Sequence, residues 1–208
     1  MKRLAILGAS GHGKVVADCA ESAGWKEIEF YDDAWPRYET NGAWRVVGGT
    51  KDLLNNLSKY DGVVVAIGHN FTRLKKQTDL LTHDAPLVSI VHPGAQLSQY
   101  VQLGVGSVVM ANAVINVDSK LGFSCIVNTG AIIDHDCILG DGVHISPGAI
   151  LAGGVIVGDC SWIGIGSKII QLINVGKEVI VGAGSVVIND IENSCTVVGV
   201  PAKYLVGD

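Results

Sequence analysis

A six-residue period runs through the second half of the chain. From Leu97 onward every sixth residue is Leu, Ile or Val, and the series holds for sixteen positions to Val187. An α-helix repeats every 3.6 residues and an alternating strand every two, so neither produces this period. It fits a parallel β-helix, in which three hexapeptides form one triangular coil. The sequence therefore predicts about five coils with the aliphatic residues pointing inward, each stacked on its counterpart 18 residues away.

Glycine often follows the inward residue, as at Gly104, Gly122 and Gly140. Glycine allows the backbone angles of a tight corner. Aromatic residues make up only 6% of the chain, while Val, Ile, Leu and Gly are abundant. This composition favours stacked strands with many turns over a helical bundle.

Residues 1–94 follow a different pattern, in which short apolar runs alternate with stretches of helical character. The expected strands are residues 2–7, 27–31, 62–67 and 87–91, and the expected helices are residues 13–24, 51–57 and 70–82. Thr50 is a candidate N-cap for the second helix. Such alternation predicts a small parallel α/β sheet of the Rossmann-like type. We therefore expect an α/β domain at 1–94 and a β-helix domain at 95–208, whose segment from Cys195 forms a cap or reaches a neighbouring subunit.

Charge and composition exclude several classes of function. The formal net charge is -5 and no basic stripe is present, which argues against nucleic acid as a partner. No segment approaches the roughly 20 apolar residues that span a bilayer, so we expect no membrane insertion. The five cysteines form no CxxC pair and are expected to be reduced thiols. A cytoplasmic protein is the resulting expectation.

A glycine-rich segment, Gly8-Ala9-Ser10-Gly11-His12-Gly13, connects the first expected strand to the first helix. Small residues let the backbone approach a phosphate, and the helix N-terminus supplies free N–H groups. Asp32 and Asp33 end the second strand and Gly68 follows the third, at the strand ends where α/β sheets bind ligands. The spacing GxxGxG differs from the GxGxxG of dinucleotide binders, so NAD fits poorly. These features predict a nucleotide site, although plain turns with solvated carboxylates would give the same residues.

Of the six histidines, only His135 and His144 lie inside the predicted coils. His135 follows an inward position by two residues and should leave the prism near a corner. Asp134 and Asp136 flank it, and two acidic neighbours raise the pKa of an imidazole. A histidine that titrates near neutrality can serve as a general base. Successive side chains on a strand point to opposite faces, so His135 and Asp136 can cooperate only if a turn interrupts the strand.

The hexapeptide repeat, the Gly8–Gly13 segment and the motif Val198-Gly199-Val200-Pro201-Ala202-Lys203 together resemble one bacterial family. It contains nucleotide-4-aminosugar N-acetyltransferases and sialic acid O-acetyltransferases. The resemblance implies a left-handed β-helix, acetyl-CoA as cosubstrate, no metal, and a homotrimer. It also implies acetyl transfer to the 4-amino group of a nucleotide-linked 4-amino-4,6-dideoxy or trideoxy sugar. Such sugars enter surface glycans such as lipopolysaccharide.

The resemblance also implies roles for individual residues. His135 would be the general base, with Asp136 raising its basicity and Asn128 orienting the site. The nucleotide-sugar contacts would be Ser10, Gly11, His12, Asp32, Asp33 and Gly68. The CoA contacts would be His144, Gly153, Ile165 and Ala183. The base and much of the CoA site would come from different subunits.

Three alternatives remain at this stage. An O-acetyltransferase acting on a sialic acid could use the same base, although the glycine-rich segment favours a nucleotide-linked acceptor. A zinc enzyme would need three protein ligands, and neither histidine of the coils has a partner four or five residues away. A non-enzymatic nucleotide-binding scaffold would not need a histidine flanked by acids.

Overall fold

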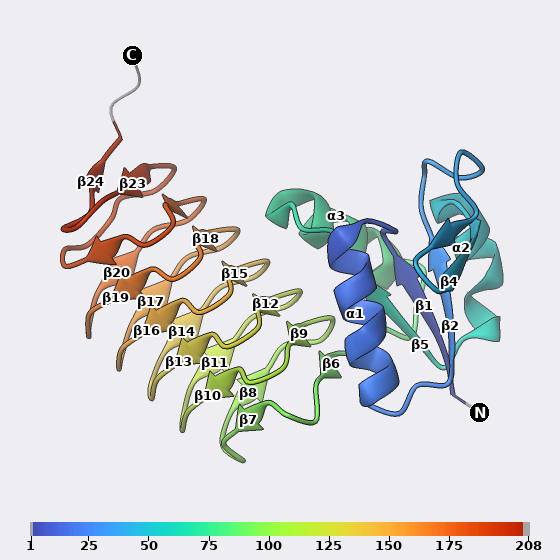
Figure 1. Cartoon of the computed structure of the whole chain (residues 1–208), viewed down its shortest axis with the longest axis horizontal. Coiled ribbons are helices and arrows are strands. Elements are labelled where there is room, and N and C mark those ends of the chain that lie inside the picture. Colours follow the sequence, from blue (N-terminus) through green and yellow to red (C-terminus); the bar gives the residue numbers. More distant parts are fainter. Residues whose placement is uncertain (1, 206–208) are drawn as a thin grey trace.

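The computed structural model describes residues 2–205 and has two halves (Figure 1). The first half is a five-stranded sheet in the order β3-β4-β2-β1-β5, parallel except for the edge strand β3. Its strands are β1 (Arg3–Leu7), β2 (Glu27–Tyr31), β3 (Thr40–Asn41), β4 (Trp44–Gly48) and β5 (Gly62–Val65). Its helices are α1 (Gly11–Ser22), α2 (Thr50–Asn56), the 3-10 turn η1 (Leu57–Lys59) and α3 (Asn70–Leu81). The predicted parallel α/β sheet is confirmed.

Apolar side chains cover both faces of this sheet, as expected for buried parallel strands. On one face, Leu4 and Ile6 pack with Val16 of α1. On the other face, Leu7 packs with Leu53 of α2 and Leu80 of α3. The hairpin of β3 and β4 is an addition that the apolar pattern did not reveal.

The start of α2 differs from the prediction, because Gly49 and not Thr50 occupies the N-cap position. The Thr50 N–H donates to Asp33 Oδ1 at 2.7 Å, and the Gly49 N–H donates to Asp52 Oδ2 at 2.9 Å. The free N–H groups of the first turn thus bind carboxylates. A carboxylate that follows β2, 17 residues before Thr50, makes a Thr50 cap unnecessary.

The second half is a left-handed β-helix with three parallel sheets as faces (Figure 1). The first face contains β6 (Ile90–Val91), β9 (Val108–Val109), β12 (Ile126–Val127), β15 (His144–Ile145), β18 (Trp162–Ile163), β21 (Ile180–Val181), β23 (Thr196–Val198) and the antiparallel β24 (Lys203–Tyr204). The second face contains β7 (Gln96–Leu97), β10 (Val114–Ile115), β13 (Ile132–Ile133), β16 (Ile150–Leu151), β19 (Lys168–Ile169) and β22 (Val186–Val187). The third face contains β8 (Gln102–Leu103), β11 (Lys120–Leu121), β14 (Ile138–Leu139), β17 (Ile156–Val157) and β20 (Asn174–Val175).

The predicted register of 18 residues is confirmed, since Ile115 pairs with Ile133 and Ile133 pairs with Leu151. Every member of the inward series from Val109 to Val187 is buried. Leu97 and Leu103 are only partly buried because each lies on the outermost strand of its face, where one neighbouring coil covers it. The stacked aliphatic residues therefore form one continuous core.

The ladder of coils begins at β6, just before residue 94, because Ile90 pairs with Val108. The strand expected at 87–91 is thus short and belongs to the β-helix, while Leu87 only bridges to Val63. The two-domain division at residue 94 stays a prediction. The halves share apolar contacts, since Ile90, Val108 and Met110 pack with the α1 side of the first sheet.

At the other end, β24 folds back on β23 and covers the last coil, as a cap would. Residues 206–208 of the expected cap lie outside the described residues. Within residues 2–205 no helix has the length and apolar character needed to cross a membrane.

Candidate active site

His135 lies at the corner between the second and third faces, after β13. Asp136 adopts a φ of 59°, in the left-handed region, so the alternation of side chains is interrupted there. The turn lets His135 Nδ1–H donate to Asp136 Oδ2 at 2.7 Å. The condition under which these two residues can cooperate is therefore met. The imidazole is accessible, with 55% of its side chain exposed.

Two carboxylates stabilise the protonated form of His135. The hydrogen bond to Asp136, followed by the negative charge of Asp134, raises the pKa of His135 above its ordinary value. Asp134 is itself held by Asn116 Nδ2 at 2.8 Å and by the His135 N–H at 2.9 Å. Because Nδ1 carries the proton that binds Asp136, Nε2 is the free proton acceptor.

Gly153 lies one coil above His135 and sets the space for its ring. A Cβ at Gly153 would lie 2.5 Å from Cε1 and 2.6 Å from Nε2 of His135, so any larger residue would displace the imidazole. Both residues line a cavity of about 450 Å³. Gly153 therefore lies beside His135, the expected base. It lies away from His144, Ile165 and Ala183, the other residues expected to contact CoA.

His144 lies on β15 of the first face in a fixed orientation. The Thr129 N–H donates to Asn128 Oδ1 at 2.8 Å, which directs Asn128 Nδ2 toward His144 Nε2 at 3.2 Å. Because an amide nitrogen can only donate, His144 Nε2 accepts and the proton of the neutral ring lies on Nδ1. Within the chain, Asn128 therefore orients His144 and not His135. The ring of Trp162 stacks on His144 with centroids 5.9 Å apart.

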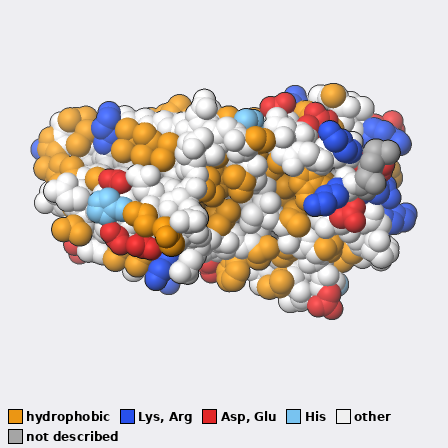
Figure 2. Space-filling model, turned by 90° about the horizontal axis from the view of Figure 1, so that it is seen from below, with side chains coloured by type: hydrophobic (Ala, Val, Ile, Leu, Met, Phe, Trp, Pro, Cys, Tyr) orange, Lys and Arg blue, Asp and Glu red, His pale blue; other side chains and the backbone are white. Residues whose placement is uncertain are grey.

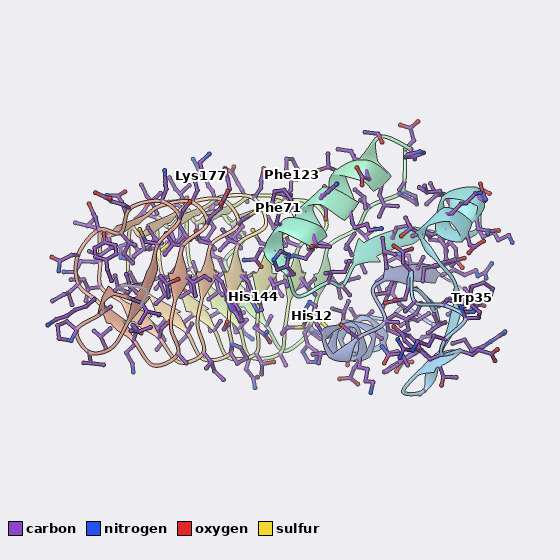
Figure 3. All side chains as sticks on the ribbon, turned by 90° about the horizontal axis from the view of Figure 1, so that it is seen from above. His12, Trp35, Phe71, Phe123, His144 and Lys177 are labelled. Carbon is purple, nitrogen blue, oxygen red and sulfur yellow. The ribbon has the colours of Figure 1, made fainter. Side chains whose placement is uncertain are left out.

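His12, at the start of α1, brings the glycine-rich segment to the coils, with its ring 6.4 Å from that of His144 (Figure 3). Burial, followed by the positive charge of Arg73, lowers the pKa of His12 to about 4 and that of His144 to about 3. Both imidazoles are therefore neutral near pH 7. Ser10 occupies the N-cap position of α1, and Gly11 and Gly68 have open space where a Cβ would lie.

Both aspartates at the end of β2 have partners within the chain. Asp32 accepts hydrogen bonds from the Ala9 N–H at 2.8 Å and the Ala34 N–H at 2.9 Å. Asp33 accepts from Lys76 Nζ at 2.8 Å in addition to Thr50. Partial burial opposes ionisation of Asp33, but the hydrogen bonds from Lys76 and Thr50 hold its pKa at about 2. These carboxylates shape the loops of the expected nucleotide site, and their contact with a nucleotide stays a prediction.

A larger cleft of about 590 Å³ separates the start of α3 from the first face of the coils. Its lining residues are Gly68, His69, Asn70, Phe71, His144, Cys160, Trp162, Glu178 and Ile180. Trp162 is 47% exposed and Phe71 is 62% exposed, so both present apolar surface to a ligand. Sequence reasoning missed these two aromatic residues. Two signals were available for Trp162: its place next to the inward Ile163, and its distance of one 18-residue coil from His144.

The expected catalytic and CoA-binding residues fall on separate corners. Ile165 and Ala183 follow strands of the first face and lie at the corner between the first and second faces. His135 lies at the next corner, and its cavity shares no residue with the cleft of His144. One chain therefore does not gather all the predicted residues in one place. Within residues 2–205, no group of three His, Cys, Asp or Glu is placed to hold a metal ion.

Comparisons with known proteins identify the family of the chain. Residues 3–80 match the family model of the PglD N-terminal domain. The acetyltransferase domain of PglB from Neisseria gonorrhoeae, solved with acetyl coenzyme A, is 43% identical, with a TM-score of 0.94, covering 98% of this chain and 99% of that one. The chain belongs to the family of acetyl-CoA-dependent sugar N-acetyltransferases. The family and the fold that the sequence motifs implied are thus confirmed.

Two further members of this family are similar to the chain. A variant of perosamine N-acetyltransferase from Caulobacter crescentus, solved with CoA and GDP-perosamine, is 38% identical with a TM-score of 0.95, covering 100% of this chain and 98% of that one. UDP-N-acetylbacillosamine N-acetyltransferase from Bacillus subtilis is 35% identical over 114 residues. That match spans 53% of this chain and 52% of the curated relative, about half of each.

Proposed function

We propose that this chain transfers the acetyl group of acetyl-CoA to the 4-amino group of a nucleotide-linked 4-amino-4,6-dideoxy or trideoxy sugar. The observation that carries the proposal is the His135–Asp136 pair, an accessible imidazole whose free Nε2 can accept a proton. Structures of relatives with acetyl-CoA, or with CoA and GDP-perosamine, support the two substrate classes. The glycine-rich segment beside His144 supports a nucleotide-linked acceptor.

The sugar amine attacks the thioester carbonyl, so that a C–N bond forms and the C–S bond breaks. His135 Nε2 takes the proton that the nitrogen must lose, directly or through one water. The resulting imidazolium is stabilised by Asp136 and Asp134, the same groups that raise its pKa. The CoA thiolate leaves and takes up a proton. No acyl-enzyme is required, because the amine attacks the thioester directly. A backbone N–H can stabilise the oxyanion that forms.

Binding of the nucleotide sugar is assigned to Ser10, Gly11, His12, Asp32, Asp33 and Gly68. These residues follow the carboxyl ends of β1, β2 and β5, where ligands of parallel sheets bind. A neutral imidazole at His12 suits this role, because it can bind polar substrate groups without attracting a counter-ion. His144, Gly153, Ile165 and Ala183 are assigned to CoA.

A homotrimer would complete the site. The corner of His135 and the corner of Ile165 and Ala183 face different directions in one chain, so a neighbouring copy would bring one against the other. Hydrophobic side chains lie in patches over the coils (Figure 2). The exposed large ones include Ile138, Ile156 and Leu172. Contiguous apolar patches of this kind favour contact with another protein surface.

The use of acetyl-CoA supports a cytoplasmic reaction, and the sugar class supports a place in surface glycan biosynthesis such as that of lipopolysaccharide. Both assignments rest on the class of relatives and not on this chain's own geometry.

The test is CoA thiol release from acetyl-CoA with a panel of UDP-, dTDP- and GDP-linked 4-amino sugars, with free and CMP-linked sialic acid included. Rapid release with one nucleotide amino sugar, lost in His135→Ala and kept in His83→Ala on the exposed surface, would support the proposal. Release with a sialic acid alone would replace it with O-acetyl transfer. Binding of acetyl-CoA without release across the panel would contradict the proposed acceptor.

A further inference from the structure

One face of α3 carries three polar residues, Asn70, Arg73 and Gln77, that point at the coils. Arg73 is fully buried and Gln77 is 3% exposed, although both side chains are strongly polar. Burial of such groups is costly unless hydrogen bonds compensate for lost hydration. The contacts of this face therefore indicate what holds α3 in place.

Arg73 uses all five of its N–H donors. Nε donates to Ser124 O at 2.8 Å, and Nη2 donates to Gly142 O at 2.7 Å, both on the coils. Nη1 donates to Ile67 O at 3.0 Å and to Gly68 O at 3.1 Å, in the loop between β5 and α3. The fifth bond goes from Nη2 to Asn70 Oδ1 at 3.0 Å. One guanidinium thus joins the cleft loop to two successive coils.

The neighbours of Arg73 on the same face extend this pattern in both directions. Asn70 Nδ2 donates to Cys160 O at 3.0 Å and to Ser161 O at 3.1 Å, one coil further on. Gln77 Nε2 donates to Val105 O at 2.8 Å, one coil earlier. Gly106, next to Val105, leaves room for the Gln77 side chain, which any Cβ there would strike.

The corner that receives these bonds repeats every 18 residues. Gly106, Ser124, Gly142 and Cys160 all have a left-handed φ, at 75°, 58°, 67° and 56°. Adjacent strands lie roughly 4.8 Å apart, and three or four residues of α-helix rise about 4.5–6 Å. The polar residues of α3 therefore match the coils one by one. The N-terminal end of α3, marked by Phe71, is the end that lies beside the coils near His144 (Figure 3).

We propose that Asn70 and Arg73 are positioning residues that hold the loop of Ile67, Gly68 and His69 in register with the coil carrying His144. This loop forms one wall of the 590 Å³ cleft, and His144 and Trp162 belong to the opposite wall. A change of register would alter the width of the cleft without altering the coils. The inference rests on the proposed function in one respect, which is that the nucleotide sugar is the ligand whose binding depends on the width of the cleft.

The charge of Arg73 supports the assignment. Its five acceptors are four main-chain carbonyls and the neutral amide of Asn70, so its positive charge is not cancelled by a direct partner. That charge contributes, after burial, to the low pKa of both His12 and His144. The same residue thus fixes the spacing of the two walls and helps keep the imidazoles of His12 and His144 neutral.

The test compares Arg73→Lys, Asn70→Ala and the control Gln77→Ala by steady-state kinetics and thermal unfolding. Lysine keeps the charge but not the fork of donors. We expect Arg73→Lys to raise KM for the nucleotide sugar about tenfold, Asn70→Ala to raise it about threefold, and both to leave KM for acetyl-CoA within about twofold. Gln77→Ala should lower Tm but leave both KM values unchanged, because its bond lies away from the cleft.

Hydrogen exchange of residues 66–72 is a second readout that needs no substrate. Exchange there should become faster in Arg73→Lys and Asn70→Ala and stay at the wild-type rate in Gln77→Ala. If the wild-type enzyme turns over no nucleotide amino sugar, the proposed function fails, and the exchange data still decide the positioning role. Unchanged loop exchange in both Arg73→Lys and Asn70→Ala would overturn the inference, as would an equal rise in KM for Gln77→Ala. Because Asn70 is partly exposed, its variant keeps the test valid if Arg73→Lys does not fold.

Discussion

The two halves of the molecule are held together by different kinds of contact. In the β-helix, each coil packs on coils 18 residues before and after it, and identical inward positions form one continuous core. In the α/β half, α1 covers one face of the sheet and α2 and α3 cover the other, giving two separate clusters. Stability in the coils is therefore repetitive and spreads along the stack. Order in the α/β half depends on individual contacts such as those of Arg73.

The chemistry follows the same division. The His135–Asp136 pair is local, because both residues belong to one corner of one coil. The cleft of His144 combines residues 68–71 with the first face of the coils and depends on how the halves dock. Four substitutions test this contrast between a locally built base and a cleft built by docking.

The largest effect is expected for His135→Ala. A positioned general base contributes about 10²–10⁴ to the rate, so kcat should fall by about that factor. Because His135 is exposed at a corner, Tm and acetyl-CoA binding should stay close to the wild-type values. Calorimetric titration with acetyl-CoA and thermal unfolding provide the control. A kcat within twofold of wild type would show that His135 is not the base.

Leu151→Ala should have the next largest effect, on stability. Truncation of a buried leucine costs about 2–5 kcal/mol, and Leu151 stacks between Ile133 and Ile169. Amide exchange should rise along several coils, because each depends on its neighbours. The matched change in the other half, Leu53→Ala in α2, should raise exchange in the α/β half alone. If Leu53→Ala and Leu151→Ala raised amide exchange over equally long stretches of the chain, the two halves would not differ in how their stability is distributed.

Gly153→Ala should reduce kcat by about tenfold, since a small displacement of a catalytic group has a large effect on rate. The added methyl group would lie 2.5 Å from His135 Cε1 and displace the imidazole. KM for the nucleotide sugar should not change, because Gly153 lies away from the docking cleft. The comparison of kcat with KM in steady-state kinetics checks this. A rise in KM for the nucleotide sugar with unchanged kcat would place Gly153 in nucleotide-sugar binding.

Asp136→Asn should have the smallest effect, a shift in the pH profile. The base is active when neutral, so kcat/KM falls as the pH falls through the pKa of His135. The Asp136 hydrogen bond raises that pKa, so its replacement should move the acid limb to lower pH and lower the plateau. Asp118→Asn is the matched control, since Asp118 has the same left-handed φ one coil earlier, at 60°. If the acid limb does not move in Asp136→Asn, Asp136 does not control the pKa of the base.

Much of the fold was predictable from the sequence. The aliphatic period specified the coils, their register and their core, because in a stacked repeat each contact lies at a fixed distance along the chain. The pairing of His135 with Asp136 was predicted on condition that a turn interrupts the strand, and the left-handed φ of Asp136 meets that condition. The capping of α2 by Asp33 was not predicted, since that carboxylate follows β2 and lies 17 residues before Thr50.

The tertiary structure decided the cleft. No period relates Arg73 to Ser124 or Asn70 to Cys160. These contacts arise where two independently patterned halves dock, and their partners are mostly main-chain carbonyls, which every residue possesses and no sequence pattern distinguishes. The sequence by itself thus determined the coils and the place of His135 between two acidic residues at a corner. Only the docked structure determined which residues of the two halves form the walls around His144, because that depends on relative placement and not on local pattern.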